Sequence, residues 1–114
     1  MTNGDENLER SIQALREEYL GAAPQRVAEL WGALARVQNG DRSAVAALGT
    51  LAHRLAGSAG SYGLHAVSQQ AREADQLCRA ITGAADPPSD TQIVRLKDLV
   101  QSIADAFAKA SAPE

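Results

Sequence analysis

Apolar side chains recur at spacings of three and four residues along almost the whole chain, and this periodicity is typical of amphipathic helices. Five segments share the pattern. Their repeating residues are Leu8, Ile12, Leu15 and Tyr19; Val27, Leu30, Leu34 and Val37; Val45, Leu48, Ala52, Leu55, Ala59 and Tyr62; Leu64, Val67, Ala71, Ala74, Cys78 and Ile81; and Ile93, Leu96, Val100, Ile103 and Phe107. Alanine is abundant and only four residues are aromatic, so the composition also favours helices over strands.

Signals for helix ends divide these segments. We expect helices over about 5–21, 24–39, 41–61 and 64–83, and a fifth from about 90 onward. Pro24 suits the first turn of a helix, Gly40 suits the end of one, and Asp41 and Asp90 are natural N-caps. The short link around residues 21–23 leaves open whether the first two segments form one kinked helix.

Short connections make consecutive helices antiparallel neighbours. The sequence therefore predicts an all-α fold, namely an antiparallel up-down four-helix bundle with an additional N-terminal helix. A length of 114 residues suits one domain over residues 1–114, and we expect an ordered core over about 6–110.

Charge and cysteine content limit the possible functions. The net charge of −3 lacks the basic footprint of a general nucleic-acid binder. Cys78 has no second cysteine to pair with, and charges or glycines interrupt every apolar run before it reaches the length of a membrane span. We expect a cytoplasmic protein that binds neither nucleic acid nor membranes.

One histidine has an unusual setting. On a helix over 41–61, His53 points away from the apolar stripe, and its neighbours on the solvent face at positions −7, −4, +3, +4 and +7 are all glycine or alanine. They are Ala46, Gly49, Ala56, Gly57 and Gly60. Glycine within a helix costs about 1 kcal/mol relative to alanine, so the stripe favours a surface kept clear for a docking partner. The alternative is an ordinary surface histidine whose glycines only let helices pack closely.

Neutral imidazole is a nucleophile at cytosolic pH, which makes covalent chemistry at His53 plausible.

The string Ala52-His53-Arg54-Leu55-Ala56-Gly57-Ser58-Ala59-Gly60-Ser61-Tyr62-Gly63 resembles the signature of histidine phosphotransfer (Hpt) domains, which runs approximately A-H-x-L-K-G-S-[AS]-x-x-x-G. The resemblance extends over about residues 10–108, through the segment from Leu15 past Pro24 to Leu30 and the Gly40-Asp41 turn.

The resemblance implies that His53 carries a phosphoryl group between receiver-domain aspartates in a His-Asp phosphorelay. It implies response regulator receiver domains and a hybrid sensor histidine kinase as partners, with magnesium bound by the receiver and no cofactor of the chain's own. We expect a monomeric phosphocarrier without kinase activity. The alternatives are a helical adaptor that binds receivers without transfer, and a detached phosphotransfer domain of the chemotaxis-kinase kind.

One position departs from the family pattern, because Ala56 stands where these domains usually have a lysine that neutralises the phosphoryl group. Arg72 is the preferred substitute, with Arg54 and Arg79 as further candidates, since a guanidinium can bind phosphoryl oxygens in a bidentate manner. Asp75 is expected to accept a proton from Nδ1 of His53 and so leave Nε2 nucleophilic.

Overall fold

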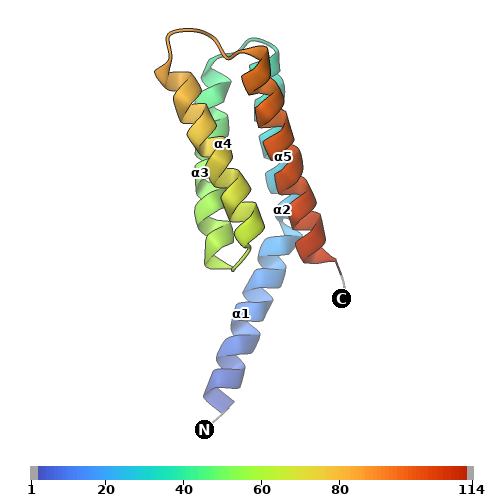
Figure 1. The fold of residues 1–114 in the computed structure, drawn as a ribbon. Coiled ribbons are helices and arrows are strands. Elements are labelled where there is room, and N and C mark those ends of the chain that lie inside the picture. Colours follow the sequence, from blue (N-terminus) through green and yellow to red (C-terminus); the bar gives the residue numbers. More distant parts are fainter. Residues whose placement is uncertain (1–2, 113–114) are drawn as a thin grey trace.

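The computed structural model describes residues 3–112, and every regular element among them is a helix (Figure 1). The helices are α1 (Asn3–Gly21), α2 (Ala23–Gln38), α3 (Ser43–Ser61), α4 (His65–Gly83) and α5 (Asp90–Ser111). The prediction of an all-helical protein is confirmed, and all five helix starts and the ends of the first four helices lie within two residues of their expected places. Within the described range, no helix combines the length and the apolar character needed to cross a membrane.

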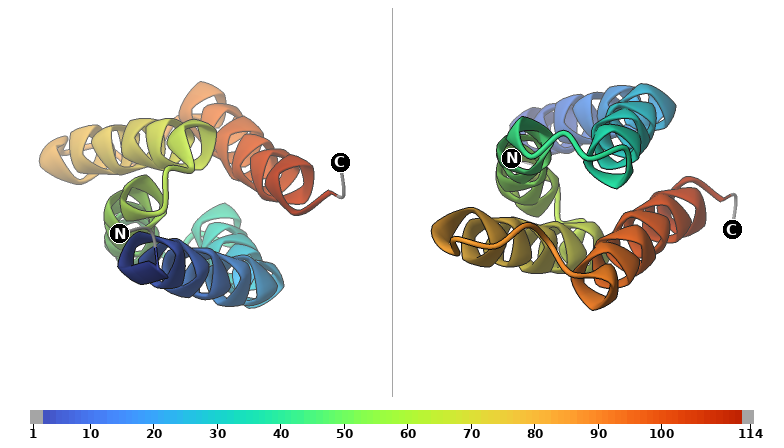
Figure 2. Two further views of the ribbon diagram at one scale, coloured as in Figure 1. Left: turned by 90° about the horizontal axis from the view of Figure 1, so that it is seen from below. Right: turned by 90° about the horizontal axis from the view of Figure 1, so that it is seen from above.

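The four helices from α2 to α5 surround a common core (Figure 2). Helix α2 packs against α3 and α5, and α4 packs against the same two helices from the other side. Consecutive members of this group run in opposite directions along the long axis (Figure 1). The largest fully buried side chains come from all four of them: Leu30, Leu34, Val45, Leu48, Val67, Cys78, Leu96, Leu99, Val100 and Ile103.

Helix α1 continues beyond the end of this group and lengthens the molecule to 60 × 24 × 17 Å. Only Ala22 separates α1 from α2, and its backbone stays in the right-handed helical region. Its N–H donates to the carbonyl of Glu18, and its own carbonyl accepts from the N–H of Arg26. Tyr19 and Leu20 are buried at this junction, whereas the apolar side chains of the first three turns are exposed.

The turn after α3 fixes how α4 lies against it. Gly63 has a φ of 73°, a left-handed conformation that glycine adopts without steric cost. The N–H of Leu64 then donates to the carbonyl of Ala59, and the N–H of Gly63 to that of Gly60. These two bonds form a Schellman motif, which ends α3 and directs the chain into α4.

The helix caps differ in part from those predicted. Ser89, and not Asp90, is the N-cap of α5, because its side chain accepts from the N–H of Gln92 while the Gln92 side chain accepts from the N–H of Ser89. Asp90 instead lies in the first turn, where a negative charge favours the helix dipole. Asp41 lies two residues before α3 and accepts from the N–H of Ser43.

Candidate functional site

Packing of α3 turns His53 outward. Leu48, Ala52 and Leu55 are buried on one side of the helix. His53 lies on the opposite side and therefore faces solvent. The His53 side chain is 66% exposed. The ring is therefore accessible, as the sequence predicts.

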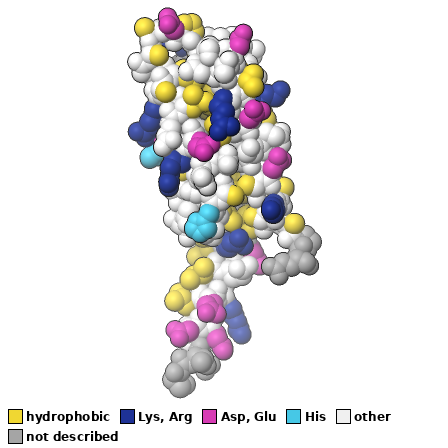
Figure 3. Space-filling view, viewed as in Figure 1, with side chains coloured by type: hydrophobic (Ala, Val, Ile, Leu, Met, Phe, Trp, Pro, Cys, Tyr) yellow, Lys and Arg dark blue, Asp and Glu magenta, His cyan; other side chains and the backbone are white. Residues whose placement is uncertain are grey.

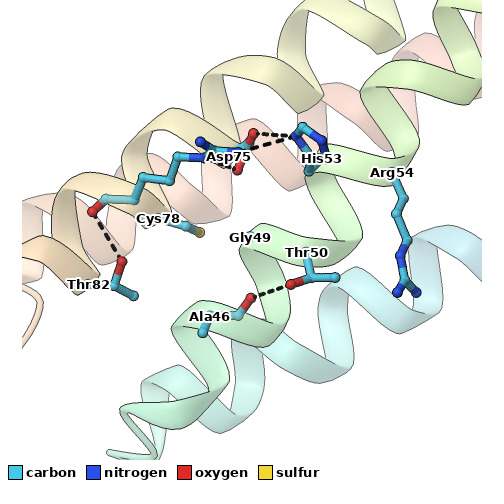
Figure 4. A pocket seen from close by; sticks show the side chains of 9 residues that line it. Ala46, Gly49, Thr50, His53, Arg54, Asp75, Cys78 and Thr82 are labelled. Atoms are coloured by element: carbon cyan, nitrogen blue, oxygen red, sulfur yellow. Dashed lines mark hydrogen bonds and ion pairs between the residues drawn. The ribbon is translucent and has the colours of Figure 1, made fainter.

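Helix α4 places a carboxylate against this ring. Nδ1 of His53 lies 3.0 Å from Oδ2 of Asp75, and the Asp75 side chain is only 12% exposed. Figure 4 shows the two side chains pointing toward one another from adjacent helices. The structure thus brings together the pair that the sequence singled out across the Gly63 turn.

The charge on Asp75 determines which partner gives the proton. Burial raises the pKa of the Asp75 carboxyl, but hydrogen bonds from His53 and Arg79 and the charge of Arg79 lower it by more, so its pKa lies below the ordinary value. An ionised carboxylate can only accept hydrogen bonds. Nδ1 of His53 must therefore carry the hydrogen, and in the neutral ring the free lone pair lies on Nε2.

Arg79 completes a cluster of three side chains. Its Nε donates to Oδ1 of Asp75 at 3.0 Å, so the carboxylate accepts from His53 through one oxygen and from Arg79 through the other. Nη2 of Arg79 lies 3.4 Å from Nδ1 of His53. A protonated Nδ1 has no lone pair to accept with, so this approach reflects the position in which Asp75 holds the guanidinium.

The cluster borders an open hollow of about 300 Å³ between α3 and α4. Its lining residues are Ala46, Gly49, Thr50, His53, Arg54, Asp75, Cys78, Arg79 and Thr82 (Figure 4). Burial, and to a lesser extent the charge of Asp75, raises the pKa of the Cys78 thiol to about 12. Cys78 is therefore a protonated core residue and not a second nucleophile.

The three candidate arginines have different positions. Arg79 contacts the pair of His53 and Asp75, because a spacing of four residues places its side chain beside Asp75 on α4. Arg72 is exposed and makes none of the described contacts with the pair, so the geometry favours Arg79 over the preferred candidate. Arg54 borders the hollow but extends away from Asp75 (Figure 4). In Figure 3, dark blue lysine and arginine side chains lie close to both cyan histidine side chains on this face of the molecule.

The small-residue stripe is only partly a free surface. Ala46, Gly57 and Gly60 are exposed, whereas Ala56 is half-buried and Gly49 is buried. A Cβ added at Gly49 would lie 3.0 Å from Cβ of Cys78, so this glycine permits the close approach of α4. Gly49 thus serves helix packing, and Gly57, with nothing within 4 Å of an added Cβ, is the glycine that best fits the predicted docking surface.

Two serines of the site region have structural partners that the sequence analysis did not assign. Ser58, in the motif, lies 2.7 Å from the hydroxyl of Tyr19 and ties α3 to the junction of α1 and α2. Ser68 donates to the carbonyl of Ala56 at 2.7 Å and ties α4 to the turn of α3 that follows His53. In the sequence, the only signal for either contact is that Ser58 belongs to the motif. Nothing in the sequence indicates the contact of Ser68.

A comparison with known protein families identifies the chain. The model of the Hpt domain family matches residues 14–106. The chain belongs to the Hpt domain family. No curated protein sequence and no solved structure gave a significant match.

Membership of the Hpt family assigns a phosphotransfer role in a His-Asp phosphorelay, with receiver domains and histidine kinases as the classes of partner. Hpt domains carry phosphoryl groups and are not themselves kinases. The exposed histidine with a carboxylate at Nδ1 is the feature of this Hpt domain that is suited to that role.

Proposed function

We propose that Nε2 of His53 accepts a phosphoryl group from the aspartyl phosphate of one receiver domain and passes it to the aspartate of another. The scaffold of this phosphotransfer protein is an up-down bundle of α2 to α5, with α1 as an N-terminal extension. The observation that carries the proposal is the 3.0 Å contact between Nδ1 and Asp75, which leaves Nε2 of an exposed ring as the free nitrogen.

In the transfer, the His53 ring reacts with the acyl phosphate of the receiver. The Nε2 lone pair forms the new N–P bond, and the bond between phosphorus and the receiver's carboxyl oxygen breaks, so that the receiver recovers its carboxylate. The proton on Nδ1 stays in place, and the ring gains positive charge as the N–P bond forms. Asp75 stabilises that charge through its hydrogen bond, and transfer to the next receiver reverses these changes.

Arg79 is suited to offset the charge of the phosphoryl group in place of the missing lysine. Its side chain is 68% exposed, and Nη2 lies within 3.4 Å of the His53 ring. Because Asp75 anchors Nε, the remaining N–H groups can turn toward oxygens on the phosphorylated ring. The charge of the phosphoryl group would thus be neutralised by an arginine on α4, and not by a lysine at position 56 on α3.

Receiver domains are proposed to dock over the exposed part of the stripe, where Ala46, Gly57 and Gly60 present no long side chain. Such a contact is small and transient, under about 1,200 Å² in total. Magnesium would accompany the receiver, and a hybrid sensor histidine kinase in the cytoplasm would be the original phosphate donor.

The absence of the family's lysine at position 56, where this chain has Ala56, favours one other function, namely an adaptor that binds receivers without phosphoryl transfer. Incubation with a receiver domain loaded by acetyl phosphate distinguishes the two. A phosphocarrier gains acid-labile phosphate, and His53→Gln abolishes this gain while the thermal midpoint stays unchanged. Binding without any labelling of the wild type would support the adaptor, and labelling of His53→Gln would place the phosphate elsewhere.

A further inference from the structure

The first four turns of α1 present an apolar face that no other part of the described chain covers. Leu8, Ile12 and Leu15 are 60%, 52% and 51% exposed. The helix projects past the bundle, and hydrophobic side chains are visible along it in Figure 3. Leu8 and Ile12 also precede residues 14–106, which the Hpt family model matches, so the family fold does not account for them.

The spacing of this face is that of a coiled-coil seam. Leu8, Ile12, Leu15 and Tyr19 are separated by four, three and four residues, which corresponds to alternating d and a positions of a heptad. The seam leads into a hollow of about 250 Å³ at the base of the bundle. This hollow is lined by Leu15, Glu18, Tyr19, Ala22, Arg26 and Tyr62. A second helix lying on the seam would find room there for an apolar side chain.

The charged residues beside the seam indicate which helix would pair with α1. Glu9 and Arg16 lie seven residues apart and occupy the same flanking position of successive heptads. When two copies of α1 lie antiparallel, Glu9 of each copy faces Arg16 of the other, and both charge pairs form at once. We propose that α1 pairs with α1 of a second copy as an antiparallel two-helix coiled coil.

In this arrangement Ile12 lies opposite Leu15 of the second copy, and Leu8 lies over the hollow beside Tyr19, whose own ring is buried against Tyr62 and Phe107. The interface is isologous, because the same patch serves both copies. A parallel pair would set Arg16 opposite Ser11 and would form no pair of opposite charges along the seam. The surface is therefore complementary to itself in the antiparallel direction only.

Arg16 is available for this contact. Its Nε donates to the carbonyl of Tyr62 at 3.4 Å, which holds the side chain at the base of the bundle, and none of the described hydrogen bonds uses its Nη atoms. The dimer involves neither α3 nor α4, so both copies of His53 stay accessible. The inference departs from the monomer expected from the sequence and does not depend on the phosphotransfer proposal.

The test measures mass against concentration by sedimentation equilibrium. Wild type should shift from monomer to dimer as concentration rises, because three exposed apolar side chains per chain give a weak interface. Ile12→Glu should weaken the dimer at least about tenfold, since it buries an unpaired charge in the seam. Ala14→Glu adds the same charge to the opposite, exposed face and should leave the dimer intact. Circular dichroism verifies that each variant is folded.

Charge reversal tests the direction of pairing. Glu9→Arg and Arg16→Glu should each weaken self-association by placing like charges together. An equimolar mixture of the two variants should dimerise again, because both pairs between positions 9 and 16 then have opposite charges. Three results overturn the proposal: a wild type that is monomeric at all concentrations, a dimer insensitive to Ile12→Glu, or a mixture that fails to associate. A monomer whose receiver binding weakens with Ile12→Glu would assign the face to the receiver instead.

Discussion

Nδ1 of His53 and Oδ2 of Asp75 lie 3.0 Å apart although 22 residues separate them in the chain. The contact depends on the Gly63 turn, which sets the register of α4 on α3, and on Gly49, which allows α4 close enough to reach the ring. A buried carboxylate that accepts from both His53 and Arg79 holds the imidazole in one tautomer and one orientation.

Asp75→Asn is predicted to slow phosphorylation of His53 about tenfold. The amide is nearly the same size but has no charge, so it stabilises the positively charged ring less well than a carboxylate. The rate of label uptake from a phosphorylated receiver measures the effect. Glu73→Gln, which removes a carboxylate from the same helix where it pairs with Arg95, is the matched control and should keep the wild-type rate. Equal rates for Asp75→Asn and wild type would contradict the role of Asp75.

Asp75 should also contribute stability that depends on pH. Its pKa is lower in the folded protein than the ordinary 3.8, so the unfolded chain binds more protons as the pH falls. The contribution is complete above about pH 5 and is lost as the pH falls through 3.8 toward the lower folded pKa.

Urea unfolding of wild type and Asp75→Asn at several pH values measures this contribution. The difference in free energy of unfolding between the two proteins should shrink as the pH falls below about 5. A difference that grows on acidification would mean that the pKa of Asp75 is raised by the fold and not lowered.

The glycines of α3 should respond in opposite ways to alanine. Gly49→Ala should lower the free energy of unfolding, because overpacking against Cys78 costs about 1–3 kcal/mol and exceeds the gain of about 1 kcal/mol in helix propensity. Gly57→Ala should raise it by up to about 1 kcal/mol, since nothing lies near the added Cβ. Thermal or urea unfolding compares the two. A stabilising Gly49→Ala would show that α4 moves aside easily.

Gly57 also tests the docking surface. Gly57→Leu places a branched side chain one turn from His53 and should weaken receiver binding while leaving the fold stable. Titration of wild type and variant with the receiver gives the two affinities. Unchanged affinity and transfer rate would show that the receiver docks elsewhere on the bundle.

Helix periodicity and glycine signals were sufficient to predict five helices and their boundaries, because each helix has a continuous apolar stripe and a local signal at its end. The apolar stripe on α1 did not indicate whether another helix would cover it. Leu8, Ile12 and Leu15 have the spacing of a buried face, but they lie beyond the end of the bundle and no intramolecular neighbour reaches them.

The site was predictable to the extent that it lies on one helix. A helical wheel places Gly49 and Gly57 at similar angles of about 40° on either side of His53. It does not say which side α4 covers, and α4 covers the side of Gly49. The choice between Arg72 and Arg79 has the same origin, because both lie one turn from Asp75 and only the packing of α4 on α3 decides which one lies near His53.

The final prediction compares these two arginines. Arg79→Ala should slow phosphoryl transfer or shorten the phosphohistidine lifetime by about threefold to tenfold, a modest effect because the guanidinium is largely exposed. Arg72→Ala removes the same charge from the same helix without breaking a described contact, and it should change the rate less. Adding Ala56→Lys to Arg79→Ala should restore part of the loss, because a lysine one turn from His53 can reach the same phosphoryl oxygens. If Arg72→Ala has the larger effect, the charge comes from Arg72. If both variants transfer at the wild-type rate, the receiver itself neutralises the phosphoryl group.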